Sequence, residues 1–130
     1  MRRRTPSSER GSITVVTAAV IAVAVVATMG AADVGKALIA RAHAQEAADA
    51  AALAAAQELA FATGRDPAWW AGDYAARNGA SLTACRCVRG STEAVVTVSV
   101  TVGHLLLLPG SRSATASARA VLDLPGAGPP

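Results

Sequence analysis

The sequence contains little of what active sites and large hydrophobic cores are built from. Its 130 residues include two Trp, one Tyr, one Phe, two His and two Cys. It lacks a glycine-rich phosphate loop, a GxSxG nucleophile motif, an HExxH zinc motif and any cluster with metal-ligand spacing. An enzyme would need a cleft that gathers His43 or His104 with carboxylates, and the spacing gives no sign of one. We therefore expect no enzyme, no cofactor, no metal site and no small-molecule substrate.

An excess of one charge is also missing from most of the chain. Four of the 12 basic residues and one of the 9 acidic residues lie in residues 1–11, which leaves eight of each sign in the remainder. That neutral remainder has no basic stripe interleaved with aromatic residues, which is the signature of a nucleic-acid-binding surface. We expect no nucleic-acid partner. Because alanine dominates the apolar residues, we also expect a thin core.

The longest feature that is present is an uncharged run from Ser12 to Ala32. Its 21 residues would form a helix about 31 Å long, close to the hydrocarbon thickness of a bilayer. Four arginines and one glutamate precede it, and positive charge beside a first membrane helix favours the cytoplasmic side. The pattern predicts residues 1–11 as a basic cytoplasmic tail, residues 12–32 as a single transmembrane helix in contact with lipid, and the rest outside the cytoplasm.

A cleaved secretory signal is the alternative interpretation of the same region. It would combine the basic start and the apolar run with small residues at Met29–Ala32 as the cleavage site. The product would be a secreted small binding module released near Ala32.

An alanine-rich extracytoplasmic helix is expected to continue the membrane helix over residues 33–63, with a kink allowed near Gly30 or Gly35 and a stop at Thr63–Gly64. Asp33 and Lys36 are spaced as a surface ion pair just outside the membrane. Small side chains on one face would suit close packing against another helix, although alanine-rich helices are also simply common. The apolar face that would suit such packing comprises Leu38, Ala42, Ala52, Ala56, Leu59 and Ala60.

Residues 64–123 are expected to form a small α+β domain. Asp66–Pro67 is typical of a helix start, and that helix would end near Asn78. Strands are predicted over residues 81–88, 93–102 and 114–122, because the apolar period changes to two. The predicted fold class is therefore α+β: a long N-terminal transmembrane helix, a short second helix, and a small three-stranded antiparallel sheet. The proline- and glycine-rich residues 124–130 are expected to be a disordered tail.

Two apolar segments are candidates for contact with a partner. Trp69 and Trp70 would either supply core bulk or lie at a membrane interface or partner contact. Four consecutive leucines, Leu105, Leu106, Leu107 and Leu108, precede Pro109–Gly110. They would fill the core, extend the second strand, dip toward lipid, or form an exposed contact patch.

Cys85 and Cys87 are a candidate for a local disulfide. Two residues along a strand separate the Cα atoms by about 6.5–7 Å, the upper limit of disulfide geometry. An external location would permit the bond. Two thiolates alone make an incomplete metal shell.

The order of these parts resembles the TadE/TadG-like family of Flp (Tad) pilus-assembly proteins, and most closely the small TadE-like branch encoded near secretion ATPase genes. The segments that carry the resemblance are Glu9–Ser12, Gln45–Ala56, and Ala76–Ala80 followed by a cysteine and valine-rich strands. The resemblance implies a pseudopilin-like structural subunit of a pilus or secretion apparatus. Such a subunit would be single-pass in the bacterial cell membrane, with other subunits of the apparatus as partners and no catalysis.

The resemblance also implies a processing site between Gly11 and Ser12. Pilin-like relatives are cut after a glycine, and the fifth residue beyond the cut is a glutamate. The fifth residue here is Val16, so the chain departs from the pilin pattern at the position linked to processing and polymerisation.

Overall fold

The computed structural model describes residues 9–123, and its architecture is a long helix, a short helix and a three-stranded antiparallel sheet. The predicted α+β fold class is therefore confirmed. Most of the predicted basic tail (residues 1–8) and the tail predicted to be disordered (residues 124–130) lie outside the described residues. The elements are α1 (Glu9–Phe61), α2 (Pro67–Arg77), β1 (Ser81–Arg86), β2 (Glu93–Val102) and β3 (Arg112–Val121).

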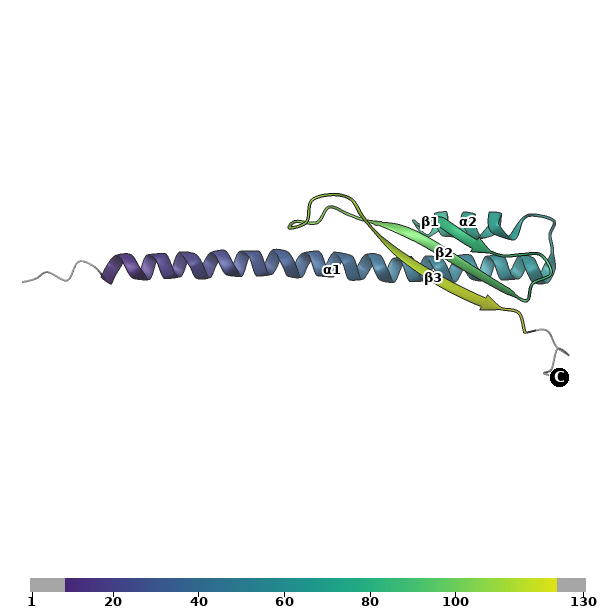
Figure 1. Ribbon diagram of the computed structural model, residues 1–130, viewed down its shortest axis with the longest axis horizontal. Coiled ribbons are helices and arrows are strands. Elements are labelled where there is room, and N and C mark those ends of the chain that lie inside the picture. Colours follow the sequence, from purple (N-terminus) through teal and green to yellow (C-terminus); the bar gives the residue numbers. More distant parts are fainter. Residues whose placement is uncertain (1–8, 124–130) are drawn as a thin grey trace, which may run out of the picture.

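Helix α1 is a 53-residue rod, and only its C-terminal half is covered by the rest of the fold (Figure 1). It is continuous because alanine is the strongest helix former and no proline interrupts the segment. Figure 1 shows α1 as a straight rod, and Gly30 and Gly35 both lie within this one continuous helix, so the kink that the sequence allowed is not formed. Both glycines are therefore accommodated within a regular helix.

The C-terminal end of α1 is closed by the side chain of Glu58. Its carboxylate accepts hydrogen bonds from the Thr63 backbone N–H (2.8 Å), the Thr63 hydroxyl (2.6 Å) and the Gly64 backbone N–H (3.1 Å). Gly64 has a φ of 99°, which glycine adopts without the steric cost that a side chain would bring. The chain can therefore reverse direction directly after Phe61, close to the predicted Thr63–Gly64 stop.

Helix α2 begins where the sequence predicts. The Asp66 carboxylate accepts a hydrogen bond from the Ala68 N–H (3.0 Å), and Pro67 occupies the first helical position. Gly79, with a φ of 69°, follows the end of the helix. The buried residues Ala71 and Ala75 face the core.

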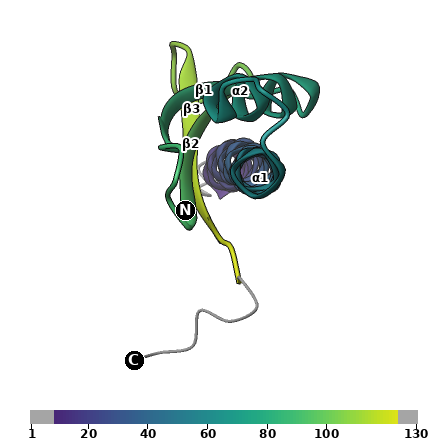
Figure 2. The ribbon, with the colours of Figure 1, turned by 90° about the vertical axis from the view of Figure 1, so that its right-hand side faces the viewer.

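The sheet has the order β1-β2-β3, and both helices lie on one of its faces (Figure 2). Helix α1 contacts β2 and β3, whereas α2 contacts β1 and α1. Predicted and observed strand bounds agree for β2, and differ by up to two residues for the ends of β1 and β3. In β1 the register shifts between Leu82 and Ala84, so Leu82 pairs with Val98 and Cys85 pairs with Val96. This bulge turns both Leu82 and Cys85 toward the helices.

The core is built almost entirely from alanine and valine. Alternate residues of β2 point inward, and the largest fully buried side chains are Val96, Val98 and Pro67. Small side chains on both layers allow the backbone of α1 to approach the sheet closely. The α1 residues in the core cluster are Ala47, Ala48, Ala51, Ala52, Ala55 and Ala56.

The apolar face of α1 that the sequence suggested for packing against another helix is divided between the core and the surface. Ala52 and Ala56 are buried and Leu59 packs against the core, but Leu38 is 63% exposed and Ala42 and Ala60 are also exposed. In a helix where alanine occurs on every side, the pattern gives little information about which side is covered. The side that faces the core carries alanine at each cluster position between 47 and 56, with Leu59 beyond them.

Candidate interaction surfaces

The N-terminal half of α1 presents a continuous apolar surface. Residues 11–29 are exposed, and the hydroxyls of Thr17 and Thr28 donate to backbone carbonyls one turn earlier (2.9 and 2.8 Å), which satisfies their polar atoms within the helix. Within residues 9–123, α1 is the one helix long and apolar enough to cross a membrane by length and composition. The large exposed apolar residues are Ile13, Val15, Val16, Val20, Ile21, Val23, Val25, Val26 and Met29.

A loop between β2 and β3 is fastened to α1 at the end of this apolar surface (Figure 1). The buried carboxylate of Asp33 accepts the backbone N–H of Leu106 (2.7 Å) and of Leu107 (2.8 Å). The Nζ of Lys36 donates to the His104 carbonyl (2.9 Å). The two charged residues were predicted to pair with each other; instead, each binds the loop.

These contacts explain the electrostatics of Asp33. The hydrogen bond from the Leu106 N–H, followed by that from the Leu107 N–H, lowers the pKa of the Asp33 carboxyl below its ordinary value. Lys36 adds a smaller effect of the same sign. The carboxylate is therefore held in its charged form, although it is covered by the loop.

We call Leu105–Leu108 the leucine tip, and its side chains remain largely uncovered. Leu105 is half-buried, whereas Leu106, Leu107 and Leu108 are 58%, 44% and 48% exposed. Strand β2 ends at Val102, so the tip does not extend it, and the tip does not belong to the core cluster. Both of those expectations were wrong. The physical reason is that the loop is tied to α1 through its backbone, which leaves the side chains outside.

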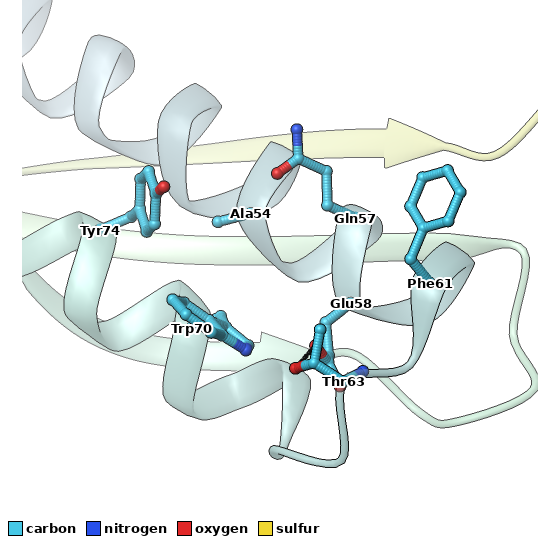
Figure 3. Close-up of a pocket in the computed structure, with 7 residues that line it drawn as sticks. All are labelled: Ala54, Gln57, Glu58, Phe61, Thr63, Trp70 and Tyr74. Atoms are coloured by element: carbon cyan, nitrogen blue, oxygen red, sulfur yellow. Dashed lines mark hydrogen bonds between the residues drawn. The ribbon is translucent and has the colours of Figure 1, made fainter.

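A second surface lies where the ends of α1 and α2 meet (Figure 3). It contains a pocket of about 310 Å³. The Trp70 indole Nε1 is buried there and has no hydrogen-bond acceptor among the described residues. The lining residues are Ala54, Gln57, Glu58, Phe61, Thr63, Trp70 and Tyr74.

The aromatic residues form a cluster beside this pocket rather than the centre of the core. The rings of Trp69 and Trp70 meet edge to face at 4.9 Å, and Tyr74 lies 6.4 Å from Trp70. Trp69 is 46% exposed, and the Arg65 guanidinium lies 4.3 Å from its ring centre. Neither tryptophan belongs to the core cluster, so the expectation that they supply core bulk was wrong.

The described residues offer little for acid–base or metal chemistry. Residues 9–123 contain no group of three or more His, Cys, Asp or Glu that could hold a metal ion. The pKa of Glu58 is lowered, chiefly by the hydrogen bond from the Thr63 hydroxyl. The pKa of Asp33 is lowered in the same way, by the hydrogen bonds that it accepts. A carboxylate stabilised in its charged form is a poor general acid near neutral pH. His43 and His104 are exposed and lie on different elements.

Cys85 and Cys87 are bonded to each other in the structure, with Cα atoms 5.5 Å apart. This is shorter than the spacing expected in a strand, because β1 ends at Arg86 and the chain leaves the extended conformation there. Cys87 is buried against the core cluster and Cys85 is half-buried beside it. The disulfide therefore holds the end of β1 against the core.

Two of these functional contacts were missed in the sequence. Asp33 and Leu106 lie 73 residues apart, and no local pattern connects a carboxylate with two backbone N–H groups at that distance. The Glu58 contacts had a local signal, since Glu58 precedes Thr63–Gly64 by five residues at a predicted helix end.

The comparisons with known proteins point to the same segment of the chain. The family model described as "Putative Flp pilus-assembly TadE/G-like" matches residues 11–58, which lie entirely within α1. The match confirms the resemblance to TadE/TadG-like proteins over that segment. No curated protein and no solved structure matches the chain. The matched domain and the long apolar helix fit a pilus-related membrane subunit.

Proposed function

We propose that the protein is a pseudopilin-like structural subunit of a Tad/Flp-type pilus or related secretion apparatus. It is anchored in the bacterial cell membrane by residues 12–32, with its N-terminus in the cytoplasm and the α+β domain outside. The proposal rests mainly on how α1 is covered. Within the segment that matches a pilus-assembly family, the first half is exposed and apolar, and the second half is packed against the rest of the fold. The matched family is structural rather than enzymatic.

The part of α1 outside the membrane also supports a role in assembly. Ile39 and Leu53 are 66% and 58% exposed on the part of α1 that follows Asp33. With Leu38 and the small Ala42, they give a partner helix an apolar strip to pack against. Partner subunits would therefore bind α1 both within the bilayer and just outside it.

The aromatic cluster is a second contact that we assign to a partner. Trp69 is half-exposed, so its ring offers an incoming subunit a large apolar contact area. Tryptophan is enriched at the energetic centres of protein interfaces, because it combines a large apolar area with a hydrogen-bond donor.

Processing at Gly11–Ser12 belongs to the same proposal. A Cβ on Gly11 would meet nothing within 4 Å, so no other part of the fold covers this side of the helix. Val16, at the position of the pilin glutamate, is 59% exposed and uncharged. The subunit would therefore join an assembly through apolar helix packing, without the intramembrane ion pair of pilins.

Anchoring is favoured over release as a secreted module by the contacts at Asp33. Cleavage near Ala32 would make Asp33 the first residue and would remove Gly30, beside which the Leu107 side chain lies. Membrane fractionation followed by N-terminal sequencing tests the proposal. We expect a salt-resistant membrane protein that begins at Met1 or Ser12. A soluble protein that begins near Asp33 would refute it.

Assembly is tested by photo-crosslinking in cells that express the whole apparatus. A photoreactive residue in place of Leu53 should give crosslinks to other subunits, whereas the same residue in place of Thr115, on the exposed face of the sheet, serves as the matched control. Equal crosslinking at both positions, or none at Leu53, would contradict the assigned surface.

A further inference from the structure

The leucine tip lies at the level where the apolar surface of α1 ends. A Cβ built on Gly30 would stand 3.6 Å from the Leu107 Cδ1, and Gly30 is within the uncharged run. Asp33, the first charged residue after that run, holds the tip through Leu106 and Leu107. The leucine tip is therefore continuous with the surface of α1 that we assign to lipid.

Three backbone polar groups in and beside the leucine tip have hydrogen-bond partners on α1, as an apolar environment requires. Backbone N–H and C=O groups that leave water must find partners, because an unsatisfied group costs several kcal/mol in hydrocarbon. Asp33 satisfies two N–H groups of the tip, and Lys36 satisfies the carbonyl of His104 immediately before it. The same two N–H groups stabilise the Asp33 carboxylate at the membrane boundary, where an unpaired charge would be unfavourable.

The side chains of the tip carry no polar atom, and Leu106, Leu107 and Leu108 keep 44–58% of their surface exposed. An exposed apolar patch of this kind marks a contact with lipid or protein. Its position beside the end of the uncharged run favours lipid, because the patch and α1 would enter the same layer together.

We propose that the leucine tip inserts into the outer interface of the bilayer beside α1 and forms a second membrane contact. This inference rests on the proposed function, because it requires α1 to span the membrane. One helix alone leaves the outer domain free to rotate about the helix axis and to tilt. A second contact, tied rigidly to α1 at Asp33, fixes which face of the domain is turned toward neighbouring subunits.

The test measures how deeply labelled positions enter a bilayer. Full-length protein is reconstituted into phospholipid vesicles, and single cysteines labelled with an environment-sensitive fluorophore are introduced by Leu106→Cys, Val20→Cys and Thr115→Cys. Leu106 and Thr115 are both exposed, but Thr115 lies on the sheet. Labelling under non-reducing conditions spares the native cysteine pair, and wild-type protein carried through labelling is the blank.

Lipids brominated at shallow or deep acyl positions then report the depth of each label. Interfacial apolar groups lie about 5–10 Å into the boundary, so the shallow quencher should lower Leu106 fluorescence about twofold more than Thr115 fluorescence. Val20 should respond most to the deep quencher. Leu108→Cys is a second position in the tip and should behave like Leu106→Cys, which keeps the test valid if one variant fails to fold.

The outcomes separate this inference from the proposed function. Quenching at Val20 without quenching at Leu106 and Leu108 would leave the anchor intact and overturn the inference, as expected if a protein partner covers the leucines instead. Equal quenching at Leu106 and Thr115 would also overturn it, because the contact would not be specific to the tip. Absence of quenching at all positions would refute the membrane anchor itself.

Discussion

The substitution Ala51→Leu tests whether the thin core depends on the close approach of α1 to the sheet. Ala51 has no exposed surface and belongs to the core cluster between α1, α2 and the sheet. Leucine adds three carbon atoms, and extra carbons in a packed core force backbone shifts or strained rotamers that cost about 1–3 kcal/mol, occasionally more. We expect the upper part of this range, because the surrounding alanine side chains have no rotamers with which to make room.

The expected effect on thermal unfolding follows from the size of the outer domain. For a domain of about 90 residues, 1 kcal/mol shifts the Tm by roughly 4–8 °C, so a loss of about 2–3 kcal/mol lowers the Tm by roughly 10–20 °C. The assay is near-ultraviolet circular dichroism in detergent, because the aromatic cluster on α2 reports the outer domain and not the membrane half of α1.

Ala42→Leu is the matched control. It makes the same change in the same helix at an exposed position, and leucine is nearly as good a helix former as alanine, so its Tm should stay within about 3 °C of the wild type. If Ala51→Leu melts like the wild type, the core has room that the structure does not show. If Ala42→Leu is equally destabilised, the effect comes from the helix and not from packing.

Three further predictions concern individual contacts. Asp33→Asn should speed amide hydrogen exchange in the leucine tip at neutral pH, and unchanged exchange would contradict the assigned hydrogen bonds from Leu106 and Leu107 to Asp33. In the wild type the pKa of Asp33 is lowered on folding, so the stabilisation from this contact is complete above the ordinary value of 3.8 and is lost as the pH falls through the lowered pKa. Glu58→Gln should increase tryptic cleavage after Arg65 severalfold at neutral pH, because a neutral amide accepts hydrogen bonds more weakly than a carboxylate. Unchanged cleavage would show that the Glu58 carboxylate is not needed to hold the turn after α1. Intact mass measured after iodoacetamide treatment should show no modification of Cys85 and Cys87 in unreduced protein and two after reduction; modification without reduction would contradict the bond.

The elements were predictable where the sequence carries a strong local period. Strand β2 was placed at its observed bounds because Val96, Val98, Val100 and Val102 alternate with threonine and serine, and this alternation fixes which face of the strand turns inward. The start of α2 was predictable because Asp66–Pro67 combines a capping side chain with a fixed φ. These signals act within a few residues and do not depend on the rest of the fold.

The candidate contacts could not be predicted in the same way. The side of α1 that the sheet covers was ambiguous because alanine occurs on all sides, and Leu38, which shares the predicted apolar face with the buried Ala52 and Ala56, is exposed. The position of the leucine tip depends on backbone N–H groups, which every residue except proline possesses, and on Asp33, which lies 73 residues before Leu106. The uncharged run of residues 12–32, which we propose as the anchor, was apparent in the sequence because a membrane span needs only length and the absence of charge.

The alanine core has a consequence for how the protein is made. In the orientation that we propose, the packed half of α1 would be exported before β3, which covers it through Ala118. This face would therefore be exposed to water until the sheet forms. A face of alanine methyl groups exposes less apolar surface than a face of leucines, so the unfinished chain is less prone to bind unrelated proteins before it folds.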